Sequence, residues 1–187
     1  MKERPILFSA PMVRALLAGT KTQTRRIFKP DRMTWDANGR YTTYAMRGGE
    51  LSTTGSGPFK PSSWLHYCPY GQPGGDRLYV RETWAAPHAY DHLPPRLIPQ
   101  DARIHYAATE DRGGLLWRPS IHMPRWASRI TLEVTGVRVE TLGVISHEDA
   151  LAEGVSSIEE YKALWINING AWLPETWVWV LDFKGLP

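Results

Sequence analysis

The fold is organised around the stretch Leu17-Ala18-Gly19-Thr20-Lys21-Thr22-Gln23-Thr24-Arg25-Arg26. Apolar residues recur at helical spacing just before it, over residues 12–17, and Pro11 suits the first turn of that helix. Gly19 is the residue type favoured in the left-handed conformation after a helix, so the helix is expected to stop there. Residues 22–28 are expected to be extended. The turn between helix and strand therefore presents an amine, hydroxyls and a pair of guanidiniums together.

The composition indicates one α+β domain. The chain has 187 residues, of which 42% are hydrophobic, enough for a core but short for two full domains. Nine Trp, 16 Gly and 15 Pro favour a loop-rich β fold, and no long helix separates successive predicted strands. We expect a small β-barrel of about five to seven strands with short helices packed at the barrel ends. Residues 1–187 are expected to form this single domain, with loop insertions near 31–63 and 87–100.

The charge balance permits an anionic partner without requiring one. Lys and Arg number 22 against 19 Asp and Glu, a formal net charge of +3 that allows a basic face for a nucleic acid. The single cysteine, Cys68, excludes an internal disulfide framework and suits a reducing cytoplasm. The start of the chain lacks the apolar run of a signal peptide, and no run is long enough for a membrane span. We expect a cytoplasmic protein with no membrane partner, and the sequence leaves its oligomeric state open.

Further strands are predicted over residues 77–84, 103–108, 129–139 and 177–183. In the first of them one face carries Leu78, Val80, Glu82 and Trp84, and the other carries Tyr79, Arg81 and Thr83. A glutamate on the apolar face is unexpected unless it is paired or lines a pocket. A bulge is expected at Gly136. In the first insertion Asn38-Gly39 predicts a hairpin turn, whereas residues 52–58 are predicted to be a flexible loop.

Two helices are predicted near the C-terminus. Ser146 caps the first, with Asp149 in place of the capping-box glutamate, and this helix runs to Glu153. Residues 157–165 open the second helix, which should end near Asn169-Gly170.

Five sequence motifs follow one another along the chain: residues 19–26 (GTKTQTRR), 75–84 (GDRLYVRETW), 126–132 (WASRITL), 145–155 and 177–180. In these motifs the sequence resembles the ASCH-domain proteins of the PUA-like superfamily, especially the longer members found in phages and prophages. The resemblance implies a β-barrel with a cleft between barrel and helices, and RNA or a modified nucleoside as partner. One bacterial branch of the family hydrolyses N4-acetylcytidine with a lysine, a threonine and a glutamate. By motif these roles fall on Lys21, Thr24 and Glu153.

The chemistry of that branch sets conditions on the turn. A threonine hydroxyl is a poor nucleophile at neutral pH, so Thr24 needs a base, and Lys21 is the nearest candidate. Burial, or the charges of Arg25 and Arg26, would lower the pKa of Lys21 and favour its neutral form. Residues three apart in a regular strand point to opposite faces, so Lys21 and Thr24 can cooperate only if the backbone bends between them. We therefore predict Lys21 on the turn, Thr24 as the first inward residue of the strand, and Arg26 facing the same cleft as Thr24.

The turn and the strand at 77–84 supply further candidates for contact with a nucleoside. These are Thr22, Arg25, Arg26, Tyr79, Arg81, Glu82 and Trp84. Each candidate also has a purely structural interpretation. The basic residues can form a solvated turn, the threonines can be there because they favour strands, and Glu153 can be an ordinary helix-end residue. Glu82 can form a structural ion pair with Arg81, and Trp84 can belong to the core. Tyr79 is the better candidate for stacking, since every nucleobase has a π-face.

No metal and no cofactor are expected. His88, Asp91 and His92 are close in sequence, but the surrounding prolines argue against a helix that would align them. His66 and Cys68 lack partner ligands at zinc-like spacing. The sequence thus favours an amidohydrolase that removes an N4-acyl group from a cytidine derivative. A noncatalytic reader of RNA or modified bases, and a ribonuclease, are the alternatives.

Overall fold

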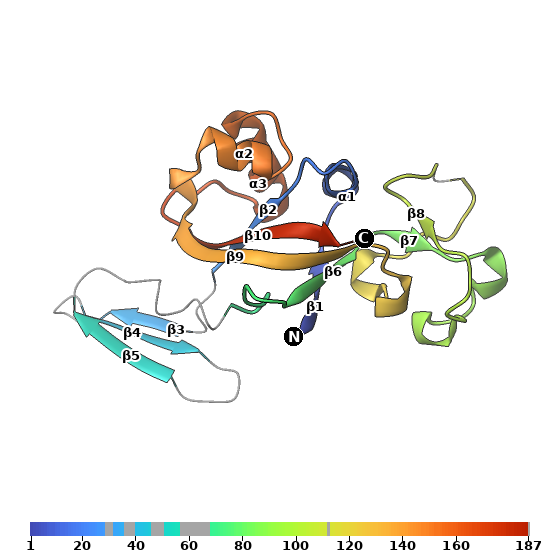
Figure 1. The fold of residues 1–187 in the computed structure, drawn as a ribbon, viewed down its shortest axis with the longest axis horizontal. Coiled ribbons are helices and arrows are strands. Elements are labelled where there is room, and N and C mark those ends of the chain that lie inside the picture. The colour runs from blue at the N-terminus through green and yellow to red at the C-terminus, as the bar shows by residue number, and fades with distance from the viewer. Residues whose placement is uncertain (29–31, 36–39, 46–50, 57–67, 112, 187) are drawn as a thin grey trace.

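The computed structural model describes residues 1–28, 32–35, 40–45, 51–56, 68–111 and 113–186 (Figure 1). Its main sheet has five strands in the order β1-β6-β9-β10-β2. Their bounds are Glu3–Leu7 for β1, Arg77–Arg81 for β6, Thr131–Thr141 for β9, Trp177–Leu186 for β10 and Gln23–Ile27 for β2. β1 pairs with β6 in parallel, and the other pairs are antiparallel. The sheet is therefore mixed.

Three helices lie on one side of this sheet (Figure 1). They are α1 at Ala10–Leu17, α2 at His147–Ala152 and α3 at Ile158–Asn169. Buried residues of each helix, including Val13, Ala150 and Trp165, belong to the same apolar core as the strand residues Leu78, Val134 and Val180. These helices and the sheet confirm the α+β class.

The predicted closed barrel is not shown by the strand pairings of the described residues. The order of the sheet places β1 and β2 at its two edges, and the chain leaves β1 for α1 soon after Leu7. A side chain connects the edges, since Arg26 Nη2 donates to the Leu7 carbonyl at 2.8 Å. The described sheet is thus a five-stranded mixed sheet whose edge strands are bridged by a guanidinium.

The helix caps follow the sequence closely. Pro11 lies in the first turn of α1, and Gly19 after it has φ +73°. Ser146 and Asp149 form both hydrogen bonds of the predicted capping box of α2. Gly170 ends α3 at φ +88°. The predicted bulge is also present, because the β9–β10 register shifts between Asp182 and Phe183, opposite Gly136.

The first insertion contains a separate antiparallel sheet in the order β3-β4-β5, with bounds Arg32–Trp35, Arg40–Ala45 and Leu51–Ser56. The prediction of a loop from residue 52 is therefore wrong for the part that forms β5. Thr53 and Thr54 lie opposite Thr43 and Thr42 in the register, and β-branched residues favour strands more than the nearby glycines oppose them. The predicted Asn38-Gly39 turn lies outside the described residues.

The second insertion belongs to a larger part of the chain, residues 84–127, that packs around its own small core. Trp84, Ile98 and Met123 are buried there with alanines of the neighbouring loops. The short elements of this part are β7 at Trp84–Ala85, β8 at His105–Tyr106, and 3-10 helices at His88–Tyr90, Pro95–Leu97, Ser120–His122 and Arg125–Ala127. A further 3-10 helix, Leu142–Val144, follows β9. Only two residues of the strand predicted at 103–108 are paired. In the part of the chain that is described, no helix has the length and apolarity to cross a membrane.

Candidate functional site

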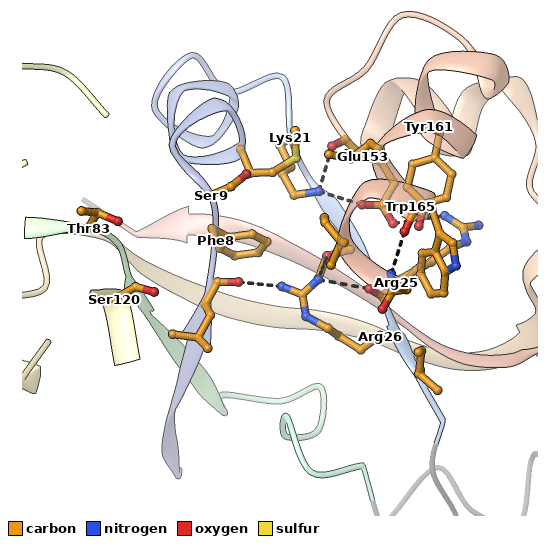
Figure 2. Close-up of a pocket in the computed structure, with 17 residues that line it drawn as sticks. Phe8, Ser9, Lys21, Arg25, Arg26, Thr83, Ser120, Glu153, Tyr161 and Trp165 are labelled. Carbon is orange, nitrogen blue, oxygen red and sulfur yellow. Dashed lines mark hydrogen bonds and ion pairs between the residues drawn. The ribbon is translucent and has the colours of Figure 1, made fainter. Parts of the chain in front are cut away.

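A cavity of about 430 Å³ lies where the end of β1, the start of α1, β2 and α3 meet (Figure 2). Its lining side chains belong to Leu7, Phe8, Ser9, Met12, Lys21, Thr24, Arg25, Arg26, Ile27, Thr83, Ser120, Glu153, Tyr161, Leu164, Trp165, Ile168 and Asn169. The cavity has the size of a small-molecule pocket. In Figure 2 the hydroxyl side chains of Thr83 and Ser120 lie on the opposite side from Tyr161 and Trp165.

The predicted bend of the chain at Lys21 is confirmed. β2 begins at Gln23, so Lys21 lies on the turn before the strand. The turn is fastened to the C-terminal end of α2, because the Thr22 N–H donates to the Ala152 carbonyl at 2.8 Å. Gly154 allows the turn to approach the end of α2 this closely. It has φ +85°, and a Cβ there would lie 3.1 Å from Lys21 Cβ.

Lys21 and Glu153 form a buried ion pair beside the cavity. Lys21 Nζ lies 2.7 Å from Glu153 Oε2, and the two side chains are 1% and 3% exposed. Nζ also donates to the carbonyls of Glu153 and Gln23, each at 2.8 Å, so all three ammonium hydrogens have acceptors. Burial lowers the pKa of Lys21, as do Arg26 and Arg25, while Glu153 opposes the shift. The lowered pKa agrees with the direction expected from the sequence, and Glu153 is the residue that the family resemblance placed with Lys21.

Helix α3 supplies aromatic side chains that the sequence analysis did not assign to the site. Tyr161 is hydrogen-bonded to Glu153, and burial raises the pKa of its phenol above the usual value. Trp165 lies one helical turn further on, with its ring centroid 6.2 Å from that of Tyr161. Both line the cavity. Their spacing of four residues on a predicted helix was the signal that could have placed them on one face.

Arg25 is held entirely by the protein. Its side chain has no exposed area, and Nη2 lies 2.6 Å from Glu140 Oε1 and 2.9 Å from Asp149 Oδ2. Nη1 donates to Gln23 Oε1 at 2.6 Å and lies 3.5 Å from Glu153 Oε1. This guanidinium therefore fixes the carboxylates around it and has little left to offer a ligand.

Arg26 has a different environment, although it is the next residue. Nη1 donates to Thr24 Oγ1 at 3.0 Å, which confirms that the two side chains share a face of β2. Nη2 donates to the Leu7 carbonyl, and the guanidinium lies over the Phe8 ring at 5.1 Å from the centroid. No carboxylate among the described residues forms an ion pair with Arg26.

The chain is similar to a solved ASCH domain. That domain, from Lactobacillus crispatus JV V101, gives a TM-score of 0.46 at 10% identity, covering 98% of this chain and 79% of that chain. Protein EF3133 from Enterococcus faecalis V583 gives a TM-score of 0.44 at 10% identity, covering 100% of this chain and 80% of that chain. No family model and no curated protein matches the sequence.

The structure brings Lys21, Thr24, Arg25, Arg26 and Glu153 together at the cavity. The other predicted contact residues are not among its lining residues, and these are Thr22, Tyr79, Arg81, Glu82 and Trp84. Thr22 is exposed on the turn. Their roles in binding stay predictions.

Residues 77–84, predicted as one strand, are divided between β6 and the start of β7, and their side chains are engaged elsewhere. The guanidiniums of Arg81 and Arg125 lie over the Tyr79 ring, at 5.5 and 5.3 Å from its centroid. Glu82 is buried and accepts two hydrogen bonds from Arg129, at 2.9 and 3.0 Å, so it forms a structural ion pair with Arg129 and not with Arg81, the partner considered in that alternative. Trp84 is fully buried in the second core.

No group of three or more His, Cys, Asp or Glu among the described residues is arranged to hold a metal ion. His88 Nδ1 lies 3.0 Å from Asp91 Oδ2 on the surface. His66 lies outside the described residues. Cys68 is buried, and burial raises the pKa of its thiol to about 11, which keeps it protonated at neutral pH.

Proposed function

We propose that this protein binds a nucleoside in the cavity and hydrolyses the N4-acyl group of a cytosine derivative such as N4-acetylcytidine. One observation carries the proposal: the Lys21–Glu153 pair, 2.7 Å apart, lines the same cavity as the Thr24 hydroxyl. A nucleophile, a base with a lowered pKa and a carboxylate that orients this base are the groups that amide hydrolysis requires.

The proposed reaction begins with a proton shift inside the ion pair. Lys21 passes a proton to Glu153 and, as a neutral amine, accepts the proton of Thr24 as Oγ1 adds to the acyl carbon. The bond from this carbon to N4 then breaks, and the leaving nitrogen takes the proton back from Lys21. Water hydrolyses the resulting threonine ester, which releases a carboxylate and a proton and restores the hydroxyl, and Glu153 returns its proton to Lys21.

The cavity walls suit the base of such a substrate. Phe8, Tyr161 and Trp165 supply aromatic surface, on which a nucleobase can stack. Hydroxyl groups on the opposite side, from Thr83 and Ser120, can serve as hydrogen-bond partners of a sugar.

A second candidate function, binding without catalysis, is favoured by one feature of Lys21. Its three ammonium hydrogens are all donated to protein oxygens, which is also what a purely structural link between turn and helix needs. In that case the cavity would read a base in RNA or a modified nucleoside.

The direct test is to incubate the purified protein with N4-acetylcytidine and to measure free cytidine. Thr24→Val removes the hydroxyl with little change of shape, so release should fall to background, whereas Thr24→Ser should keep part of the activity. Thr20→Val is the matched control, since the Thr20 hydroxyl is exposed and donates to the Ala15 carbonyl. Equal rates for wild type and Thr24→Val would refute the hydrolase.

The same protein incubated with a short RNA tests the other candidates. Chain cleavage would indicate a ribonuclease. RNA binding that weakens as salt rises, without cytidine release or cleavage, would indicate a reader.

A further inference from the structure

We propose that Arg26 forms an anion subsite in the cavity, and that its anion is the one the reaction generates, first the tetrahedral oxyanion and then the carboxylate product. The inference rests on the proposed function and deepens it, because it assigns the acyl group a place and Arg26 a catalytic role.

The first step is the charge balance of the cavity. Four charged side chains line it, from Lys21, Arg25, Arg26 and Glu153. Lys21 and Glu153 neutralise each other, and Arg25 meets Glu140 and Asp149. Arg26 forms no ion pair with any described carboxylate, so among these four side chains its charge alone lacks a counter-ion in direct contact within the described part of the protein.

The second step is the unused hydrogen-bonding capacity of this charge. A guanidinium has five N–H donors. Arg26 makes three hydrogen bonds, all to uncharged acceptors: Thr24 Oγ1, the Arg25 carbonyl and the Leu7 carbonyl. The remaining donors have no partner among these bonds. A half-buried cation with spare donors beside an aromatic ring stabilises an anion more than it would in water.

The third step is the position of Arg26 relative to the reacting atom. Nη1 lies 3.0 Å from Thr24 Oγ1. When Oγ1 bonds to the acyl carbon, the electron pair of the carbonyl double bond moves onto the carbonyl oxygen. That oxyanion is two bonds from Oγ1 and therefore forms next to the same guanidinium. After hydrolysis of the ester, its negative charge is carried by the released carboxylate at the same place.

A phosphate of the ligand is the competing anion. In a cytidine nucleotide the phosphate is attached to the ribose, at the far end of the molecule from N4. If N4 is presented to Thr24, the phosphate lies away from Arg26. The contact between Thr24 and Arg26 therefore favours the reacting acyl group over a phosphate.

The kinetic test compares kcat and KM for N4-acetylcytidine. Arg26→Met should lower kcat by about 100-fold to 1,000-fold with little change in KM, because the neutral acyl group of the bound substrate carries no anion and the oxyanion forms only as Thr24 adds to it. Arg26→Lys keeps the charge and should lose less. Arg14→Lys is the control and should match wild type, since Arg14 is exposed, does not line the cavity and donates to the Ala108 carbonyl. An unchanged kcat for Arg26→Met, or a loss confined to KM, would overturn the inference.

A binding test does not depend on turnover. Sodium acetate and sodium phosphate are titrated at constant ionic strength into free wild-type, Arg26→Met and Arg26→Lys proteins, and binding is followed by NMR. Saturable acetate binding that Arg26→Met abolishes is the expected result. Arg26-dependent binding of phosphate without acetate binding would overturn the inference. A melting curve shows whether Arg26→Met is folded, and Arg26→Lys serves in its place if it is not.

The two tests separate the two possible failures. Hydrolysis that is insensitive to Arg26 would overturn this inference and leave the proposed function intact. Absence of hydrolysis together with Arg26-dependent acetate binding would overturn the proposed reaction and leave a carboxylate subsite.

Discussion

The two faces of β2 carry arginines with opposite environments. Arg25 points into an ion-pair network with the carboxylates of Glu140, Asp149 and Glu153. Arg26 points to the opposite face, where its partners are a hydroxyl, backbone carbonyls and the Phe8 ring. Adjacent residues of one type can therefore have different roles, and the partners of each decide which role it has. Arg25 is paired with carboxylates, whereas Arg26 has N–H donors left over from its three hydrogen bonds, which is why we propose it for ligand binding.

This ion-pair network extends beyond Arg25. Arg138 on β9 binds Asp149 at 2.8 Å and Asp182 at 3.0 Å, and Gln23 donates to Asp182 at 2.8 Å. It thus ties β2, β9 and β10 to the start of α2. By contrast, on the face of β2 that carries Thr24 and Arg26, the Arg26 side chain connects the two edges of the sheet through its hydrogen bond to the Leu7 carbonyl.

The largest expected effect is on stability when Arg25 is replaced. Arg25→Met removes the fully buried cation that Glu140, Asp149 and Glu153 share and leaves them with Arg138 or Lys21 alone, so the free energy of unfolding should fall by about 3–5 kcal/mol. Arg26→Met loses hydrogen bonds to uncharged acceptors and should cost about 1 kcal/mol. Urea unfolding of both variants measures the difference. Equal losses would remove the distinction between the two faces.

The next effect is expected at Gly154. Gly154→Ala forces a Cβ to within 2.9 Å of Ala15 Cβ and 3.1 Å of Lys21 Cβ at φ +85°. We expect a loss of about 1–3 kcal/mol from overpacking, added to the strain of a positive φ. Gly170→Ala is the matched control, because its φ is +88° and no atom lies within 4 Å of the new Cβ. Thermal melting and cytidine release should both suffer more in Gly154→Ala than in the control, and a similar loss in both variants would mean that the contact with Lys21 is unimportant.

A smaller effect is expected on the stability of the protein at acid pH. Burial raises the pKa of Asp149, but the Ser146 N–H and the Arg25 guanidinium outweigh it and leave this pKa below the usual value. A carboxyl whose pKa is lowered by folding stabilises the protein above its unfolded pKa of about 4, and the stabilisation is lost as pH falls further. Asp149→Asn should therefore flatten the decline of stability below about pH 4. Urea midpoints across this range test it, with Glu159→Gln on the surface of α3 as control. If the urea midpoint of Asp149→Asn depends on pH as that of the wild type does, the stabilising role of the Asp149–Arg25 ion pair is contradicted.

The smallest effect is expected for Tyr161→Phe. The substitution removes the hydrogen bond to Glu153 and keeps the ring against the cavity, so the free energy of unfolding should fall by about 1 kcal/mol. Substrate KM should change little. A large rise in KM would show that the hydroxyl, and not the ring, contacts the ligand.

The local structure around the turn could be predicted because its signals are local. Pro11, Gly19, Ser146 and Gly170 each determine a helix end by local chemistry alone, and all four have the expected places. The bend at Lys21 followed from strand periodicity. Glu153 as its partner came from a family resemblance, and it lies 132 residues away in the chain.

The parts that could not be predicted depend on distant pairing. Nothing near Glu82 in the sequence shows that Arg129 binds it, and Arg81 was the nearer choice. Alternation alone cannot say which face of residues 77–84 borders a cavity, so Tyr79 and Trp84 were taken for contact residues although neither lines it. The opposite roles of Arg25 and Arg26 arise from carboxylates on β9, α2 and the residue after α2, which the turn itself does not reveal.

A crystal structure with cytidine and acetate bound would test the central claim most directly, namely that the Thr24 and Arg26 face of β2 is where chemistry occurs. We predict cytosine against Tyr161 or Trp165, and the acetate carboxylate within hydrogen-bond distance of Arg26 and next to Thr24 Oγ1. Cytidine bound instead beside Tyr79 and Arg81, with the cavity empty of both molecules, would contradict the account.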